Sequence, residues 1–145
     1  MKRNKFIEEL RSTADRLLEG AKDSVREDGR ADPVCVVLYE DGRRDFLYPR
    51  WKDEDQKIEA FSVMNQHIKD TGADGAVLVL ETIFRPRADS ELPQARALFT
   101  TKRAFGFKEF EAVLFEVGDE VEWKGEMGPS GDYVDHWITA FEEVH

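Results

Sequence analysis

The sequence predicts a single α+β domain over residues 1–145, with a mixed, mostly antiparallel sheet of about five strands and three helices in the order α-β-β-α-β-β-β-β-α. Three observations lead to this prediction. Segments with apolar residues at helical spacing alternate with short β-branched or aromatic runs. The length is that of one ordinary domain. Ten Phe, three Trp and three Tyr indicate a packed core despite a charged content of 36%.

Three segments have the apolar periodicity of a helix. The first runs from Phe6 to Val25, and Gly29 followed by Pro33 ends it. The second begins near Asp53, which can cap it together with Gln56, and ends at 71–72. Its expected buried stripe consists of Ile58, Phe61, Met64 and Ile68. The third covers 133–144. We expect all three to pack against the sheet.

The strands fall between these helices. An Asp41-Gly42 turn joins two apolar runs and predicts a hairpin. A run that is apolar on both faces predicts the central strand. A second hairpin turns at 118–120, and 127–131 is expected to be a linker. Residues 95–104 fit either a helix or a strand, and a strand from 97 to 104 is favoured. The expected strands are thus 34–39, 44–48, 76–84, 97–104, 111–117 and 121–125.

The single cysteine, Cys35, lies in an apolar run and is expected to be a small buried hydrophobe. A chain with one cysteine has no internal disulfide, which fits a reducing compartment. The N-terminal segment lacks the apolar stretch of a signal peptide, and the longest apolar run, 76–80, is too short to cross a bilayer. The expected location is therefore the cytoplasm, with no membrane association.

The net charge of −10 is concentrated near the C-terminus. Residues 106–145 contain eleven acidic side chains against only Lys108 and Lys124, and so carry −9. Because binding to nucleic acid requires a basic surface, direct nucleic-acid binding is not expected. An acidic surface fits a protein partner with a basic surface, or an inhibitor that mimics nucleic acid.

Glu81 interrupts the central apolar strand and is the first catalytic candidate. A buried carboxylate without a partner would have a raised pKa that suits acid–base chemistry. The favoured alternative is a structural ion pair, with Arg85, Arg87 or Arg103 as the partner. Whether Glu81 is buried is left open by the sequence.

His136 is the second catalytic candidate, because it lies beside Asp135 and four residues after Asp132. An acid can tune an imidazole at this spacing. The three side chains are expected on the exposed side of the third helix, where surface charges are the common interpretation. We expect no metal site and no cofactor, since no paired metal-ligand motif or glycine-rich phosphate loop occurs.

The aromatic residues between the late strands are the leading binding candidates. Phe105, Phe107 and Phe110 surround a glycine, and protruding phenylalanines would anchor an interface. The alternative is that one or two of them fill the core. A second possible binding surface is 48–51, which places Tyr48 and Trp51 at a strand–helix junction; Trp51 is expected to cover one end of the second helix. The acidic binding candidates are Glu109, Glu116, Glu120 and Glu122.

These features favour a small, acidic, non-enzymatic domain that binds a protein partner. Two alternatives stay open: an inhibitor that mimics nucleic acid through the acidic C-terminal face, and a small enzyme that uses Glu81 or the Asp132/Asp135/His136 cluster. A homodimer, formed through the first helix or an edge strand, is a further alternative.

Overall fold

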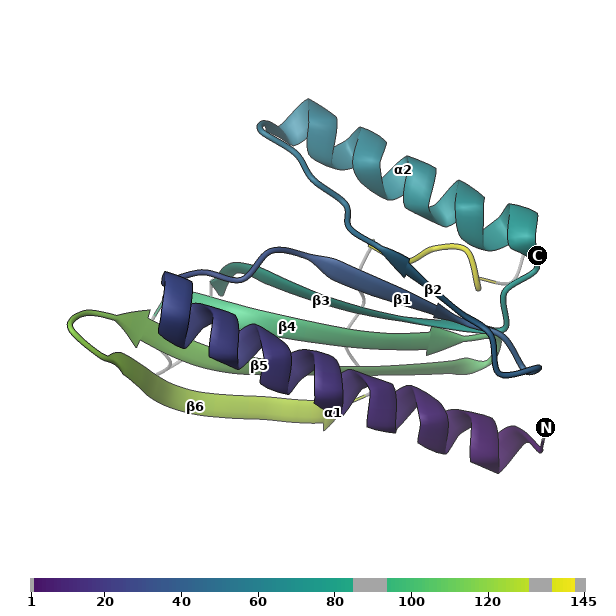
Figure 1. The fold of residues 1–145 in the computed structure, drawn as a ribbon, viewed down its shortest axis with the longest axis horizontal. Helices are drawn as coiled ribbons and strands as arrows, with labels where there is room; N and C mark the ends of the chain where they lie inside the picture. The colour runs from purple at the N-terminus through teal and green to yellow at the C-terminus, as the bar shows by residue number, and fades with distance from the viewer. Residues whose placement is uncertain (1, 85–93, 131–136, 143–145) are drawn as a thin grey trace.

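The protein is described here by a computed structural model that covers residues 2–84, 94–130 and 137–142 (Figure 1). These residues form α1 (Arg3–Asp28), β1 (Val34–Leu38), β2 (Arg44–Leu47), α2 (Glu54–Thr71), β3 (Gly75–Phe84), β4 (Ala95–Ala104), β5 (Phe107–Val117) and β6 (Val121–Ser130). The strands make one sheet in the order β2-β1-β3-β4-β5-β6. The α+β class is confirmed. The sheet has six strands instead of about five, and its described pairings are all antiparallel instead of mixed.

Helix α1 packs along one face of the sheet (Figure 1). Its predicted stripe is buried: Phe6, Leu10 and Ala14 contact one group of strand residues, and Leu18 and Val25 contact another. The strand residues of the two groups are Val36, Leu38 and Val77, and Leu98, Val113 and Phe115. The helix ends at Gly29, whose φ of 76° is the left-handed conformation that glycine adopts without strain. The amphipathic pattern therefore placed α1 correctly.

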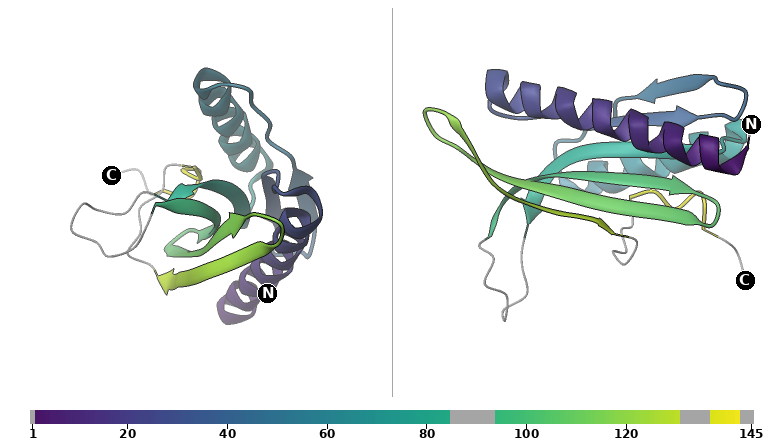
Figure 2. Two further views of the ribbon diagram at one scale, coloured as in Figure 1. Left: turned by 90° about the vertical axis from the view of Figure 1, so that its left-hand side faces the viewer. Right: turned by 90° about the horizontal axis from the view of Figure 1, so that it is seen from below.

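Helix α2 packs against the opposite face (Figure 2). The Asp53 side chain accepts a hydrogen bond from the Gln56 amide at 2.8 Å, which is the predicted N-terminal cap. Phe61, Met64 and Ile68 are buried against Cys35, Val37, Leu78 and Leu80. Ile58, the other member of the predicted stripe, is instead 63% exposed, so the buried stripe begins at Phe61. Neighbouring side chains of a strand point to opposite faces. The odd-numbered residues of β1 therefore pack against α2, and its even-numbered residues pack against α1.

Cys35 lies in this second core and is fully buried. Burial raises the pKa of its thiol to about 12, because the charged thiolate is poorly solvated there. The side chain acts as the small core hydrophobe that the sequence predicts.

The second half of the chain forms a meander, β3-β4-β5-β6. The segment left open between helix and strand is strand β4, which begins at Ala95. The expected linker at 127–131 was wrong for its described part, because β6 continues to Ser130 and pairs that residue with Phe110. The reason is the length of β5, which starts four residues before the predicted strand and offers backbone partners to this segment.

The predicted third helix is absent from 137–142, the part of its segment that the structure describes. Residues 131–136 and 143–145 lie outside the described residues, and 137–142 consist of bends and turns. Ile138 and Phe141 are buried against the α2 core, beneath the helix (Figure 1). The Asn65 side chain holds this segment: its Nδ2 donates to the Trp137 carbonyl at 2.8 Å, and its Oδ1 accepts from the amides of Thr139 and Ala140 at 2.9 and 3.1 Å. These bonds satisfy backbone groups that a helix would satisfy internally.

Candidate functional site

Glu81 is part of an ion pair on the α1 face of the sheet. Arg96 donates from Nε and Nη2 to the two carboxylate oxygens, both at 3.0 Å, and the Ala31 amide donates to Oε1 at 3.2 Å. Arg96 also donates to the Gly29 carbonyl at 2.6 Å. The structural interpretation is the one this geometry favours, but the described partner is Arg96 instead of Arg103. Arg85 and Arg87, the other two predicted partners, lie outside the described residues. Sequence reasoning missed Arg96 because the pairing follows from the register between β3 and β4.

The three phenylalanines have three different surroundings. Phe105, at the turn between β4 and β5, is 53% exposed and meets the Phe141 ring edge-on at 5.3 Å. Phe107 is half-buried against the α1 core, with the Arg11 guanidinium 5.7 Å from its ring centre. Phe110 is buried on the other face, 5.0 Å from Phe99. They do not form one exposed cluster, because alternation along β5 and the turn send them in different directions.

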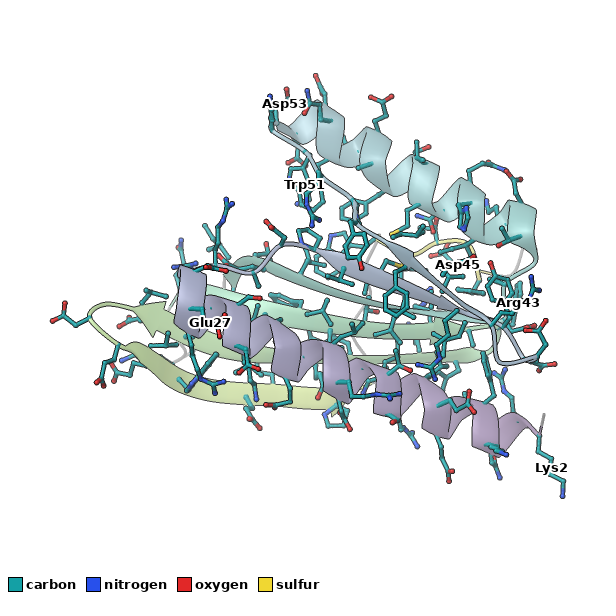
Figure 3. All side chains as sticks on the ribbon, viewed as in Figure 1. Lys2, Glu27, Arg43, Asp45, Trp51 and Asp53 are labelled. Atoms are coloured by element: carbon teal, nitrogen blue, oxygen red, sulfur yellow. The ribbon has the colours of Figure 1, made fainter. Side chains whose placement is uncertain are left out.

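Trp51 lies on the side of α2 that faces the sheet (Figure 3). Its ring centre is 5.2 Å from that of Phe61, and the Lys57 ammonium lies 5.7 Å from the same ring. Trp51 packs against the α2 core and covers the beginning of the helix, as the sequence predicts.

Glu109 is committed to a charge network beside α1. Lys102, only 3% exposed, donates to Glu109 at 2.9 Å and lies 3.4 Å from Glu111. Arg11 of α1 contacts both oxygens of Glu109, at 3.0 and 3.3 Å. Partial burial raises the pKa of the Glu109 carboxyl, but hydrogen bonds from Arg11 and Lys102 lower it by more, so the net shift is downward. This network keeps the Lys102 charge paired in the interior.

The other acidic candidates lie elsewhere. Glu116 and Glu122 pair across β5 and β6, with Lys124 between them at 3.5 and 2.9 Å. Their neighbours Phe115 and Trp123 face α1, so both carboxylates project from the opposite face. Glu120 lies exposed in the turn between the strands. The acidic side chains of residues 109–122 are thus divided between both faces and the turn.

The His136 cluster cannot be placed, because Asp132, Asp135 and His136 all lie outside the described residues. Within 2–84, 94–130 and 137–142, no group of three or more His, Cys, Asp or Glu side chains is arranged to hold a metal ion.

An open, apolar site lies between β2 and one flank of α2. It is a groove of about 230 Å³ whose lining residues are Leu47, Tyr48, Pro49, Ala60, Val63, Met64 and His67; we call it the β2–α2 groove. Tyr48, which follows the end of β2, lines the groove on one side and is 59% exposed. Val63 of α2 lines it on the other side and is 64% exposed. Exposed apolar side chains that share a concave surface are typical of interaction sites.

A hydrogen-bonded trio lies at the edge of this groove. The Tyr39 hydroxyl donates to Asp45 Oδ2 at 2.5 Å, and Nε2 of His67 lies 3.3 Å from the same oxygen. These two contacts, with that of Tyr39 the larger, lower the pKa of Asp45. Burial and then the Asp45 contact raise the pKa of Tyr39. The trio links Tyr39, directly after β1, to Asp45 of β2 and His67 of α2, and His67 lines the groove. Asp45 is labelled in Figure 3.

Beside the groove, β2 is an edge strand. Among the described residues it pairs with β1 alone, at one end of the sheet. An edge strand presents unpaired backbone N–H and C=O groups to its surroundings. The sequence indicated 48–51 as a possible binding surface, but it did not predict the groove, because the groove requires contact between residues of 47–49 and 60–67.

The chain matches no known family model, and no curated protein or solved structure is significantly similar to it. In the part of the chain that the structure describes, neither helix has the combination of length and apolar character needed to cross a lipid bilayer.

Proposed function

We propose that this protein is a non-enzymatic binding domain that takes an extended segment of a partner protein at β2 and the β2–α2 groove. The observation that carries the proposal is the position of an exposed apolar groove directly beside a strand that pairs on one side only. A bound segment would pair its backbone with β2 and insert an apolar side chain between Tyr48 and Val63. Main-chain pairing supplies affinity in this mode, and the pocket for alternate side chains supplies specificity.

The opposite edge of the sheet supports this choice by contrast. On β6, the exposed residues Glu122, Lys124 and Glu126 are charged, and Pro129 lacks a backbone donor. Charges and proline on an edge strand discourage pairing with another chain. On β2, the charged side chains of Arg44 and Asp45 are bound to Thr13 and Tyr39 within the protein. Leu47 and Tyr48 line an apolar hollow beside this strand.

The net charge of −10 favours a partner with a basic surface, because complementary charge accelerates association. The division of the acidic side chains between two faces does not favour a mimic of nucleic acid, which needs a row of charges on one face. The closed contacts of Glu81 with Arg96 and the Ala31 amide likewise do not favour Glu81 as an acid–base catalyst.

The test selects peptides from a random display library on the full chain and measures their affinity by calorimetry. We expect selected peptides to share a bulky apolar residue and to bind Val63→Asp at least about tenfold more weakly than the original protein. Ile58→Asp is the matched control, because Ile58 is 63% exposed on the same helix but lines the other flank. Its affinity should be unchanged.

Strand pairing is tested separately by N-methylation of the selected peptide. Every second backbone N–H group of the bound peptide should point toward β2 and donate to it. Methylation of these nitrogens should abolish binding, whereas methylation of the nitrogens between them should preserve it. Failure to select any peptide, equal binding to Val63→Asp, or indifference to N-methylation would contradict the proposal.

A further inference from the structure

A second hollow lies on the same face of the sheet as α2, past the strands that this helix covers. Helix α2 packs on residues of β1 and β3, whereas the hollow lies over β3, β4, β5 and β6. Its volume is about 300 Å³. We call it the aromatic cavity and define it by Thr82, Phe84, Phe99, Phe110, Met127 and Trp137.

The walls of the aromatic cavity are rings and a thioether. Phe99 is central: its ring centre lies 5.0 Å from that of Phe110 and 5.7 Å from that of Trp137, which it meets edge-on. Such spacings are those of favourable aromatic pairs, so the rings support one another around the hollow. Alanines occupy the adjacent positions of the sheet, since Ala97 pairs with Thr82 and Ala112 with Phe99. These small side chains do not fill the space above the strands, where the hollow lies.

Two features of the fold maintain this arrangement. The hydrogen bonds of buried Asn65 hold the segment 137–140, and they thereby keep Trp137 at the cavity. The register between β5 and β6 shifts between Phe110 and Ala112, and after the shift Met127 pairs with Ala112. A β-bulge redirects side chains in this way and is common beside binding sites. Trp137 and Met127 are therefore positioned by interactions outside the cavity itself.

We infer that the aromatic cavity binds a small, neutral, ring-containing apolar molecule. Thr82 supplies the one hydroxyl among the described lining residues, and none of those residues is charged. A charged ligand would lose hydration without gaining a partner there. A planar ring can instead pack against Phe99, Phe110 and Trp137 and approach the Met127 sulfur, contacts that aromatic and thioether groups favour. The volume is at the lower end of the range for ligand sites, which fits a small molecule.

The experiment compares two fluorescent probes with the same ring system, neutral N-phenylnaphthylamine and its anionic relative anilinonaphthalene sulfonate, on the full chain. The neutral probe should bind with one-to-one stoichiometry, with a blue shift and with quenching of tryptophan emission. The sulfonate should bind at least about tenfold more weakly, because no lining residue that the structure describes offers its charge a partner.

Three variants identify the site. Thr82→Phe should abolish neutral-probe binding by filling the hollow opposite Ala97, whereas Thr82→Val should retain it. Val63→Asp, in the β2–α2 groove, should also retain neutral-probe binding. A negative result for the aromatic cavity can therefore be distinguished from a negative result for the proposed peptide site. Circular dichroism establishes that each variant is folded. Absence of neutral-probe binding, equal affinity for the sulfonate, or undiminished binding by folded Thr82→Phe would overturn the inference.

Discussion

Arg96 on β4 and Glu81 on β3 form a two-pronged ion pair that also holds the connection between α1 and β1. The guanidinium contacts both carboxylate oxygens and the Gly29 carbonyl, while Glu81 accepts from the Ala31 amide. The guanidinium carbon also lies 4.9 Å from the centre of the Phe115 ring. One pair of side chains thereby ties the end of the first helix to the middle of the sheet.

Arg96→Met should therefore destabilise the protein. It keeps much of the packing volume but leaves the Glu81 carboxylate and the Gly29 carbonyl without this donor. We expect a loss of about 1–3 kcal/mol in the free energy of unfolding, the usual cost of losing hydrogen bonds to a charged group. Urea denaturation measures it. The double variant Arg96→Met with Glu81→Leu should recover part of the loss, and an equal or larger loss would contradict the pairing.

Gly75 lies where β3 packs closely against α1. A Cβ atom at this position would lie 3.0 Å from side-chain atoms of both Phe6 and Leu10, and 3.1 Å from the Arg103 carbonyl oxygen. Since Phe6 and Leu10 are fully buried and the carbonyl belongs to a paired strand, Gly75→Ala should cost about 1–3 kcal/mol through overpacking.

Gly20→Ala is the matched control for this substitution. Gly20 lies within α1, and an added Cβ atom has nothing within 4 Å. Because alanine is the better helix former, this change should stabilise the protein by about 0.5–1 kcal/mol. Thermal unfolding of both variants should thus give shifts of opposite sign, and a stabilised Gly75→Ala would refute the close packing.

Asn65→Ala should release the segment 137–140 from α2. The alanine leaves the Trp137 carbonyl and the amides of Thr139 and Ala140 without their partner. We expect a stability loss of about 1–3 kcal/mol and earlier proteolytic cleavage near the C-terminus. Gln66→Ala is the control, because it removes only an exposed hydrogen bond to Asp70. Identical rates of proteolysis for the two variants would contradict the conclusion that the hydrogen bonds of Asn65 hold the segment 137–140.

Asp45 should contribute to the acid dependence of stability. Its folded-state pKa is lowered by Tyr39 first and then His67, so its ionised form is favoured by folding. This contribution is present above the ordinary carboxyl pKa of about 3.9 and disappears as the pH falls through the lowered value. The stability advantage over Asp45→Asn should therefore be full at neutral pH and shrink below about pH 4.

Tyr39→Phe provides the control for the origin of this effect. Removal of the hydroxyl donor should move the acid transition of Asp45 back toward the ordinary carboxyl range. Unfolding by urea across the acid range measures both variants. A difference between the original protein and Asp45→Asn that does not vary with pH would contradict the assignment.

Local signals predicted much of the fold. The apolar stripe of α1, its end at Gly29 and the Asp53 cap of α2 each depend on residues close together in the chain. The segment 137–142 shows where such reasoning fails. Its apolar residues have helical spacing, but Asn65 and the α2 core provide partners that the local sequence does not reveal.

The sites depended on long-range contacts and were correspondingly harder to predict. Phe110 is a binding candidate from sequence and lines the aromatic cavity, but its companions Phe84, Phe99 and Trp137 come from separate strands and the chain's end. The β2–α2 groove was not predicted at all. Alternation along 44–48 indicates a strand, but it does not show that this strand lies at an edge or that Val63 will face Tyr48.

The order of the strands also governs how the chain must assemble as it is synthesised. Phe6 and Leu10 share a core with Val77 and Ala104, which emerge from the ribosome much later. Until the meander begins to form, β1 with Val36 and Leu38 is the one described strand available to cover part of the apolar side of the first helix. The packing of the earliest helix is completed by some of the later strands. A nascent chain that ends before β4 therefore leaves Leu18 and Val25 without the strand residues that bury them in the folded protein.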